Sequence, residues 1–163
     1  MDDVLARARS IRLLVLDVDG VLTDGRLHLS ADGEEMKVFH VRDGSGLVAM
    51  RRAGVEVAII SGRDSAAVAR RASELGIERV LQGVADKGAA LEALQHELGV
   101  GVEETACVGD DTPDLPMLRR AGLAIGVADS HPALHEVLHW ITPSPGGRGA
   151  VRDVCDLLLS ARG

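Results

Sequence analysis

Residues Ile11 to Asp24 read IRLLVLDVDGVLTD, and this stretch decides the fold. Its aliphatic run, residues 13–16, contains no polar residue, which is typical of a strand buried on both faces of a parallel sheet. Asp17 and Asp19 follow two residues apart, so their side chains project to the same side of an extended chain. Because ligands of open α/β sheets bind beyond the carboxyl ends of the strands, this acidic pair predicts a ligand site.

The same succession of apolar strand, polar loop and helix recurs along the chain. Further strands are expected at 55–60, 80–81, 105–108, 123–125 and 140–141, and helices at 2–10, 47–53, 65–75, 87–98, 132–138 and 151–159. Asp43 is the expected cap of the helix at 47–53. Residues 25–39 read as a hairpin with Asp32-Gly33 in its turn. We therefore expect an α/β fold, with a doubly wound, Rossmann-like and mostly parallel sheet in a single domain spanning residues 1–163 and a small β-hairpin insertion.

Composition and charge argue against several classes of function. The chain has 163 residues, a net charge of −7, one Phe, one Trp and no Tyr. Because it lacks aromatic platforms for base stacking and is negatively charged, we expect no nucleic-acid partner and no binding to anionic membranes. Cys107 and Cys155 share no metal-ligand spacing and fit buried free thiols. The N-terminus lacks the order of a signal peptide and no apolar run is long enough to span a membrane, so we expect a cytoplasmic protein.

Carboxylates also follow a later strand. The strand expected at 105–108 runs into GDDTPD, whose first acid is Asp110. Asp17 and Asp110 would meet at one edge of the sheet and offer the hard oxygen ligands that Mg²⁺ takes together with a substrate phosphate. Two interpretations of Asp111 and Asp114 stay open: they cap the following helix, or they support the metal ligands.

Ser61 and Lys87 indicate a bound phosphate. Ser61 ends the strand at 55–60 and is expected at a helix start, where its hydroxyl and nearby backbone amides can bind a phosphate oxygen. Lys87 lies in the first turn of a helix, where a cation opposes the helix dipole unless an anion lies close by. With the phosphate charge offset, Asp17 can attack phosphorus, while Asp19 protonates the leaving oxygen and then activates water. These residues predict a phosphatase.

The motifs DVDGVLTD, SGR, the lysine at a helix start and GDDTPD occur in the order found in phosphatases of the haloacid dehalogenase (HAD) superfamily, which the chain resembles over nearly its whole length. More narrowly, FHVRDGSG, VADSHP and GGRGAVRDVCDLLL resemble a family within it that acts on phosphates of 2-keto-3-deoxy sugar acids in bacterial lipopolysaccharide synthesis. The resemblance implies a HAD-like fold without a cap domain. It also implies a cytoplasmic, Mg²⁺-dependent homotetramer with a small-molecule sugar acid phosphate as its substrate.

The resemblance also implies roles for individual residues. Asp17 corresponds to the nucleophile and a metal ligand, Asp19 to the acid/base and a ligand through its carbonyl, and Asp110 to the third ligand. The substrate contacts that it implies are His40, Val41, Arg42, Asp43, Gly44, Arg63, Arg71 and Lys87. Arg63 and Arg71 lie eight residues apart and fit a solvated helix surface as well. The chain departs from the family at His40, where Asn is common, and at Val48, where an Arg that helps to hold the sugar is common.

Several functions stay open at this point. The first is hydrolysis of an eight-carbon keto-deoxy sugar acid 8-phosphate, and a close alternative is the nine-carbon acid 9-phosphate. A phosphate-binding or regulatory module without turnover belongs to a different class, but it could lose Asp19 or Lys87, and both are present. A receiver domain also uses Asp, Mg²⁺ and Lys, but it does not require two acids spaced as Asp17 and Asp19 are. The pattern favours hydrolysis.

Overall fold

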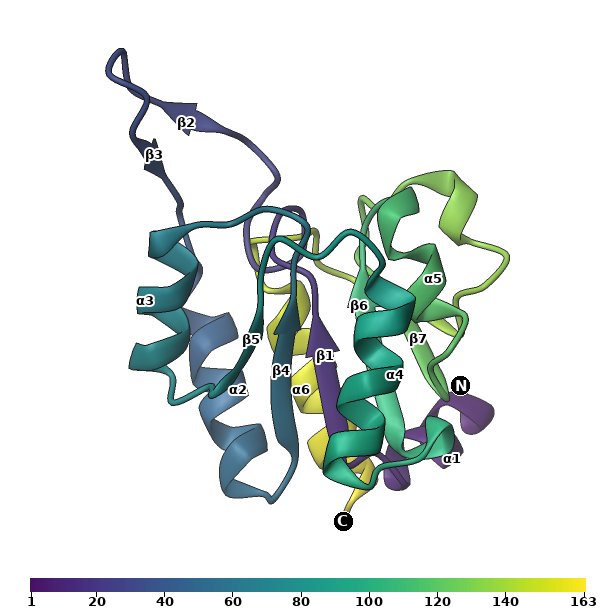
Figure 1. Ribbon diagram of the computed structural model, residues 1–163. Helices are drawn as coiled ribbons and strands as arrows, with labels where there is room; N and C mark the ends of the chain where they lie inside the picture. The colour runs from purple at the N-terminus through teal and green to yellow at the C-terminus, as the bar shows by residue number, and fades with distance from the viewer.

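The computed structural model describes residues 1–163, with a six-stranded sheet at its centre in the order β5-β4-β1-β6-β7-β8 (Figure 1). The strands are β1 Leu13–Leu16, β4 Glu56–Ile60, β5 Arg79–Leu81, β6 Thr105–Gly109, β7 Leu123–Gly126 and β8 Trp140–Ile141. Every neighbouring pair is parallel. The expected α/β fold is therefore confirmed, with a central sheet that is parallel throughout.

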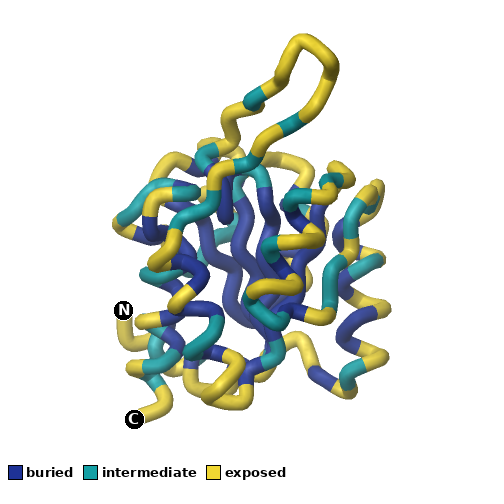
Figure 2. The backbone as a smooth tube through the Cα atoms, turned by 90° about the vertical axis from the view of Figure 1, so that its left-hand side faces the viewer, coloured by how far each residue is buried: buried dark blue, intermediate teal, exposed yellow.

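Helices cover both faces of this sheet. They are α1 Asp2–Arg9, α2 Val41–Arg52, α3 Ala66–Glu74, α4 Lys87–Leu98, α5 Leu115–Leu118 and α6 Ala150–Ala161, with short 3₁₀ turns at Val102–Glu104, Thr112–Asp114 and Pro132–Leu134. Alternate residues of β1 point to opposite faces, so Leu14 joins a core cluster of 26 buried residues and Leu13 joins one of 13. The larger cluster packs beneath α1, α2, α3 and α6, and the smaller beneath α4 and α5. Between these clusters, β1, β6 and β7 are buried along their whole length, whereas the edge strands β5 and β8 are partly exposed (Figure 2).

The chain reverses its direction of travel across the sheet beside β1. The first two crossovers lead to β4 and then β5 on one side, and the next leads to β6 on the other. Leu16 is level with Ile59 of β4 and with Val108 of β6. The residues that follow these three strands therefore lie along one edge of the sheet, at the switch point where α/β folds bind ligands.

A two-stranded hairpin projects from that edge (Figures 1 and 2). Its strands, β2 His28–Leu29 and β3 Glu35–Met36, occupy only a small part of the 25–39 segment predicted as a hairpin. The antiparallel pairing sets His28 opposite Met36 and Leu29 opposite Glu35. Within this chain the hairpin packs little of its surface, since Leu29 and Met36 are 63% and 62% exposed.

The start of α2 differs from the prediction. The helix begins at Val41 rather than at residue 47, and the His40 side chain caps it by accepting a hydrogen bond from the Arg42 N–H. Asp43 is buried and caps α6 instead, accepting from the backbone N–H of Arg152 at 2.9 Å. Glycines disfavour a helix, but a Cβ at Gly46 would lie 3.0 Å from the Cβ of Cys155, so its absence lets α2 pack closely on α6.

The predicted helix at 132–138 was also wrong, because only the 3₁₀ turn Pro132–Leu134 forms there. None of the helices combines the length and the apolar character that crossing a bilayer requires.

Candidate active site

Three carboxylates converge where β1 and β6 end. Asp17 is 6% exposed, and its backbone N–H donates to the carbonyl oxygen of Val108 at 3.1 Å, which brings the end of β1 beside Asp110. Carboxylate oxygens of Asp17, Asp110 and Asp114 all lie within 4.8 Å of one another. Gly20 permits this approach: its φ is +92°, and a Cβ there would lie only 1.9 Å from an oxygen of Asp110.

Lys87 enters the cluster from the first turn of α4. Its Nζ donates to Asp17 at 2.8 Å and to Asp114 at 2.7 Å, and its side chain is 6% exposed. Asp86 caps α4 by accepting from the N–H groups of Gly88 and Ala89. The two ion pairs explain how a lysine is tolerated at a helix N-terminus, because carboxylates supply the compensating charge.

Asp114 supports the neighbouring acids. One of its oxygens pairs with Lys87, and the other accepts from the N–H groups of Asp110 and Asp111 at 2.9 and 3.2 Å. Asp111 accepts from the Thr112 N–H and caps the 3₁₀ turn that follows. Of the two interpretations left open by the sequence, the contacts favour support for Asp114 and capping for Asp111.

Without a metal ion, burial and mutual repulsion make the ionised forms of these carboxylates unfavourable. Burial, followed by repulsion from Asp114, raises the pKa of Asp17 against the opposing effect of Lys87. Burial, followed by repulsion from Asp17 and Asp114, raises the pKa of Asp110 further. Asp110 also forms no salt bridge with any lysine or arginine of the chain, since Lys87 pairs with the other two acids.

This donor set fits Mg²⁺. Hard carboxylate oxygens held close together are the ligands that Mg²⁺ takes, and a divalent charge would relieve the repulsion that raises both pKa values. Both oxygens of Asp114 accept hydrogen bonds, whereas Lys87 contacts only one oxygen of Asp17 and no lysine or arginine pairs with Asp110, so Asp17 and Asp110 keep oxygens for a metal. The side chain of Asp19 lies outside this carboxylate group, and the role of its main-chain carbonyl as a metal ligand stays a prediction.

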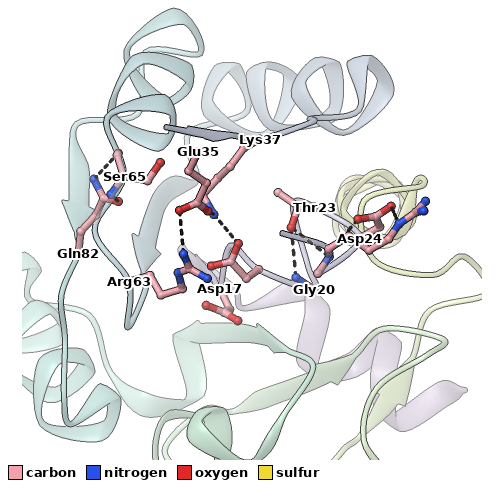
Figure 3. Close-up of polar contacts among 12 residues, drawn as sticks. Asp17, Gly20, Thr23, Asp24, Glu35, Lys37, Arg63, Ser65 and Gln82 are labelled. Carbon is pink, nitrogen blue, oxygen red and sulfur yellow. Dashed lines mark hydrogen bonds and ion pairs between the residues drawn. The ribbon is translucent and has the colours of Figure 1, made fainter. Parts of the chain in front are cut away.

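Lys37 is a further site residue, which no sequence motif predicted. Its Nζ donates to Asp19 at 2.6 Å and to Glu35 at 2.8 Å, and its side chain is only 4% exposed. The second oxygen of Glu35 accepts from Arg63 at 2.7 Å (Figure 3). Burial alone would lower the pKa of Lys37, but the hydrogen bonds with Asp19 and Glu35 outweigh it and raise that pKa. The alternation of charges in Glu35-Met36-Lys37 was the available signal, but it is common on exposed hairpins.

The remaining predicted residues fall into two groups. Ser61 and Arg63 line the same open depression as Asp17, Asp19, Lys87 and Asp110. Ser61 directly follows β4, whereas α3 begins only at Ala66, so Ser61 is not at the helix start where the sequence analysis expected it.

His40, Asp43, Gly44 and Arg71 line a second, mostly apolar pocket beneath the hairpin base, and Val41 and Arg42 are exposed beside it. Their predicted substrate contacts stay predictions.

A parallel sheet with an acidic pair after its first strand, a lysine at a later helix start and a second acidic loop defines a phosphohydrolase of the HAD class. Residues 79–153 match the family model described as haloacid dehalogenase-like hydrolase. The chain is 48% identical over 161 residues to the 3-deoxy-D-manno-octulosonate 8-phosphate phosphatase KdsC of Escherichia coli strain K12, covering 99% of this chain and 86% of that protein.

Solved structures agree with these matches. The 3-deoxy-D-manno-octulosonate 8-phosphate phosphatase of Moraxella catarrhalis, in complex with magnesium ion, phosphate ion and KDO, superposes with a TM-score of 0.97 at 44% identity, covering 99% of this chain and 93% of that one. The cobalt-bound phosphatase of Haemophilus influenzae gives a TM-score of 0.93 at 41% identity over 96% and 92% of the two chains. The chain belongs to the haloacid dehalogenase-like hydrolases and, within them, to the 3-deoxy-D-manno-octulosonate 8-phosphate phosphatase family.

Proposed function

We propose that this protein is a Mg²⁺-dependent phosphatase that hydrolyses 3-deoxy-D-manno-octulosonate 8-phosphate (KDO 8-phosphate) to KDO and inorganic phosphate, in lipopolysaccharide synthesis. The observation that carries this proposal is the buried ion pair of 2.8 Å between Asp17 and Lys87 in the acidic depression. It holds a carboxylate ready to attack beside a cation ready to bind the phosphate that is attacked. The near-complete similarity to phosphatases named for this substrate supports the choice of substrate.

In the first step an oxygen of Asp17 forms a bond to phosphorus, and the bond between phosphorus and the sugar oxygen breaks. Asp19 gives its proton to that leaving oxygen. In the second step the Asp19 carboxylate takes a proton from water, the water oxygen bonds to phosphorus, and the bond to Asp17 breaks. Phosphate leaves, and both carboxyl groups return to their starting states.

Lys87 and Ser61 hold the phosphate during both steps. Lys87 contributes a fixed positive charge, and Ser61, at the end of β4, offers a hydroxyl. Asp17, Asp110 and the carbonyl of Asp19 would hold Mg²⁺, which offsets the charge of the phosphate and of the two carboxylates when bound. Asp114 keeps Lys87 and the loop of Asp110 in place through the hydrogen bonds described above.

Recognition of the sugar acid is assigned to Arg63 and to residues in and beside the second pocket. Arg63 lies at the rim of the acidic depression, 44% exposed, and can pair with the sugar carboxylate. His40, Val41, Arg42, Asp43, Gly44 and Arg71 complete the proposed set of contacts. The family departures at His40 and Val48 keep the nine-carbon acid 9-phosphate as the alternative substrate.

We also propose a cytoplasmic homotetramer of single-domain subunits. The hairpin supports this assembly, because Leu27, Leu29, Met36 and Val38 present apolar side chains that are 51–63% exposed. Paired hairpins of neighbouring subunits would bury them and cover the open site, which the 25–39 segment is too small to do as an independent domain. The free, buried thiols Cys107 and Cys155 fit a reducing compartment.

Asp17→Asn tests the nucleophile. The amide nearly preserves the shape of the side chain but cannot attack phosphorus, so we expect turnover of KDO 8-phosphate to fall by roughly 10³-fold or more, with the fold intact. Phosphate release and circular dichroism measure the two. Asp19→Asn serves as the matched variant and should form phosphorylated enzyme slowly while failing to hydrolyse it.

Two results would count against the proposal. Activity of Asp17→Asn within tenfold of the wild type, in protein free of deamidation, would remove Asp17 as the nucleophile. Wild-type protein that binds phosphate in the presence of Mg²⁺ but turns over neither the eight- nor the nine-carbon substrate would identify a binding module instead.

A further inference from the structure

We propose that Lys37 is the positioning residue of the acid/base carboxylate, and that the hairpin thereby supplies a part of the reaction geometry. The inference rests on the proposed function, because it assigns to Lys37 a task in the chemistry that Asp19 performs. It starts from an asymmetry between the two acids after β1: they are held by different lysines from different elements, Asp17 by Lys87 of α4 and Asp19 by Lys37 of the hairpin base.

Asp19 depends on this one contact. Its carboxylate is 23% exposed, and the hydrogen bond from Lys37 at 2.6 Å is the one that a protein group donates to it. Asp114, by comparison, accepts three such bonds within the same cluster. A carboxylate on a loop with a single partner takes up other rotamers when that partner is lost, and proton transfer requires hydrogen-bond reach to the reacting oxygen.

Lys37 is itself held in place. Glu35 accepts from its ammonium group at 2.8 Å and from Arg63 at 2.7 Å, so the lysine lies between two carboxylates with its charge fully compensated (Figure 3). Arg63 follows β4, Glu35 and Lys37 belong to the hairpin, and Asp19 follows β1. The chain of ion pairs therefore ties the hairpin to two strand ends of the sheet at the mouth of the site.

The arrangement suits positioning better than binding of substrate. Lys37 and Lys87 each pair with two carboxylates, but Lys87 lines the open depression and Lys37 does not, so Lys37 is the lysine that a substrate anion does not reach. Arg63 is far more exposed than Lys37, 44% against 4% for the side chains, and is the cation that an incoming carboxylate reaches. Loss of Lys37 should therefore act on the rate of the chemical steps rather than on substrate affinity.

The test is Lys37→Met, which removes the donor and charge but keeps an unbranched, buried side chain. We expect kcat for KDO 8-phosphate to fall roughly 10- to 100-fold with KM within about threefold, since a misplaced catalytic group costs rate on this scale. Lys37→Arg should restore part of the loss. Arg26→Met is the matched control: it removes the same charge from the hairpin base, where Arg26 pairs with Asp24 rather than with Asp19, and should leave kcat unchanged.

A double-mutant cycle separates positioning from other roles. If Lys37 acts through Asp19, then Lys37→Met should slow formation of the phosphorylated enzyme in the wild-type background but by less than about twofold in the Asp19→Asn background, because the carboxylate that it positions is already gone. Additive losses, or a KM that rises while kcat holds, would overturn the inference and identify Lys37 as a substrate contact. An inactive wild type would defeat the proposed function instead, and an active wild type with a fully active Lys37→Met would defeat only this inference. Lys37→Gln gives a second variant should the methionine disturb folding.

Discussion

Asp17, Asp19 and Asp110 differ in their cationic neighbours, and this decides what each of them can do. Asp17 pairs with Lys87, Asp19 with Lys37, and Asp110 with no cation of the chain. A half-buried carboxylate that is repelled by two other acids and has no cationic partner gains most from a bound cation, so Asp110 is the residue most dependent on the metal. The protein permits this unpaired acid because Gly20 leaves space for it beside the acidic pair.

We predict that Gly20→Ala weakens Mg²⁺ binding at least tenfold and lowers activity accordingly. Its Cβ would lie 1.9 Å from Asp110, so the carboxylate must move away from Asp17. Gly33→Ala is the control, because Gly33 has a similar positive φ of +85° and a Cβ added there would have nothing within 4 Å. Backbone strain is thereby matched, at about 1 kcal/mol. The Mg²⁺ affinity of each variant is measured from the rise in its thermal stability during a Mg²⁺ titration. Equal affinities of the two variants would contradict the prediction.

At the scale of secondary-structure elements, local sequence patterns predicted which residues follow the strands. They did not predict features that depend on contacts between elements. Asp17 and Asp110 could be placed together from the sequence, because parallel strands bring their carboxyl ends to one edge. The start of α2 could not, because Gly44 and Gly46 disfavour a helix, and only their close packing against Arg71 and against Cys155 of α6, both distant along the chain, accounts for them. The contact of Lys37 with Asp19 depends on the orientation of the hairpin relative to the sheet, and no local sequence pattern determines that orientation.

The hairpin is the element for which assembly can be tested. We predict that Leu29→Glu converts the proposed tetramer into smaller species, because it places a charge among apolar side chains that pairing would bury. Val102→Glu is the control, since Val102 is 47% exposed but lies in a 3₁₀ turn outside the hairpin. Light scattering across a dilution series gives the mass, and a wild type that is monomeric and fully active at nanomolar concentration would refute the tetramer.

On the scale of the whole molecule, the acidic site opposes folding and the two cores compensate for it. The pKa of Asp17 is raised from 3.8 to about 6 and that of Asp110 to about 9, so both acids bind protons more tightly in the folded state than in the unfolded chain. Their favourable contribution is present below pH 3.8 and is lost as the pH rises through 6 and then 9. In the metal-free enzyme, these two acids therefore contribute least to folding stability at alkaline pH.

We predict that stabilisation by Mg²⁺ grows between pH 5 and pH 8. The metal binds deprotonated carboxylates and removes their repulsion, which increases over this interval. Thermal unfolding with excess Mg²⁺, compared with unfolding in a chelator, measures the increment at each pH. In Asp110→Asn the increment should be small and nearly independent of pH, and a wild-type increment as large at pH 5 as at pH 8 would contradict this account.

The division of the interior into two clusters also provides a pair of chemical reporters. Cys155 belongs to the larger cluster and Cys107 to the smaller, and burial raises the pKa of both thiols, that of Cys155 to about 12. Alkylating reagents attack the thiolate, so neither sulfur reacts while its side of the sheet stays closed. The time course of alkylation at each cysteine, read by mass spectrometry, thus records separately how often each half of the interior opens.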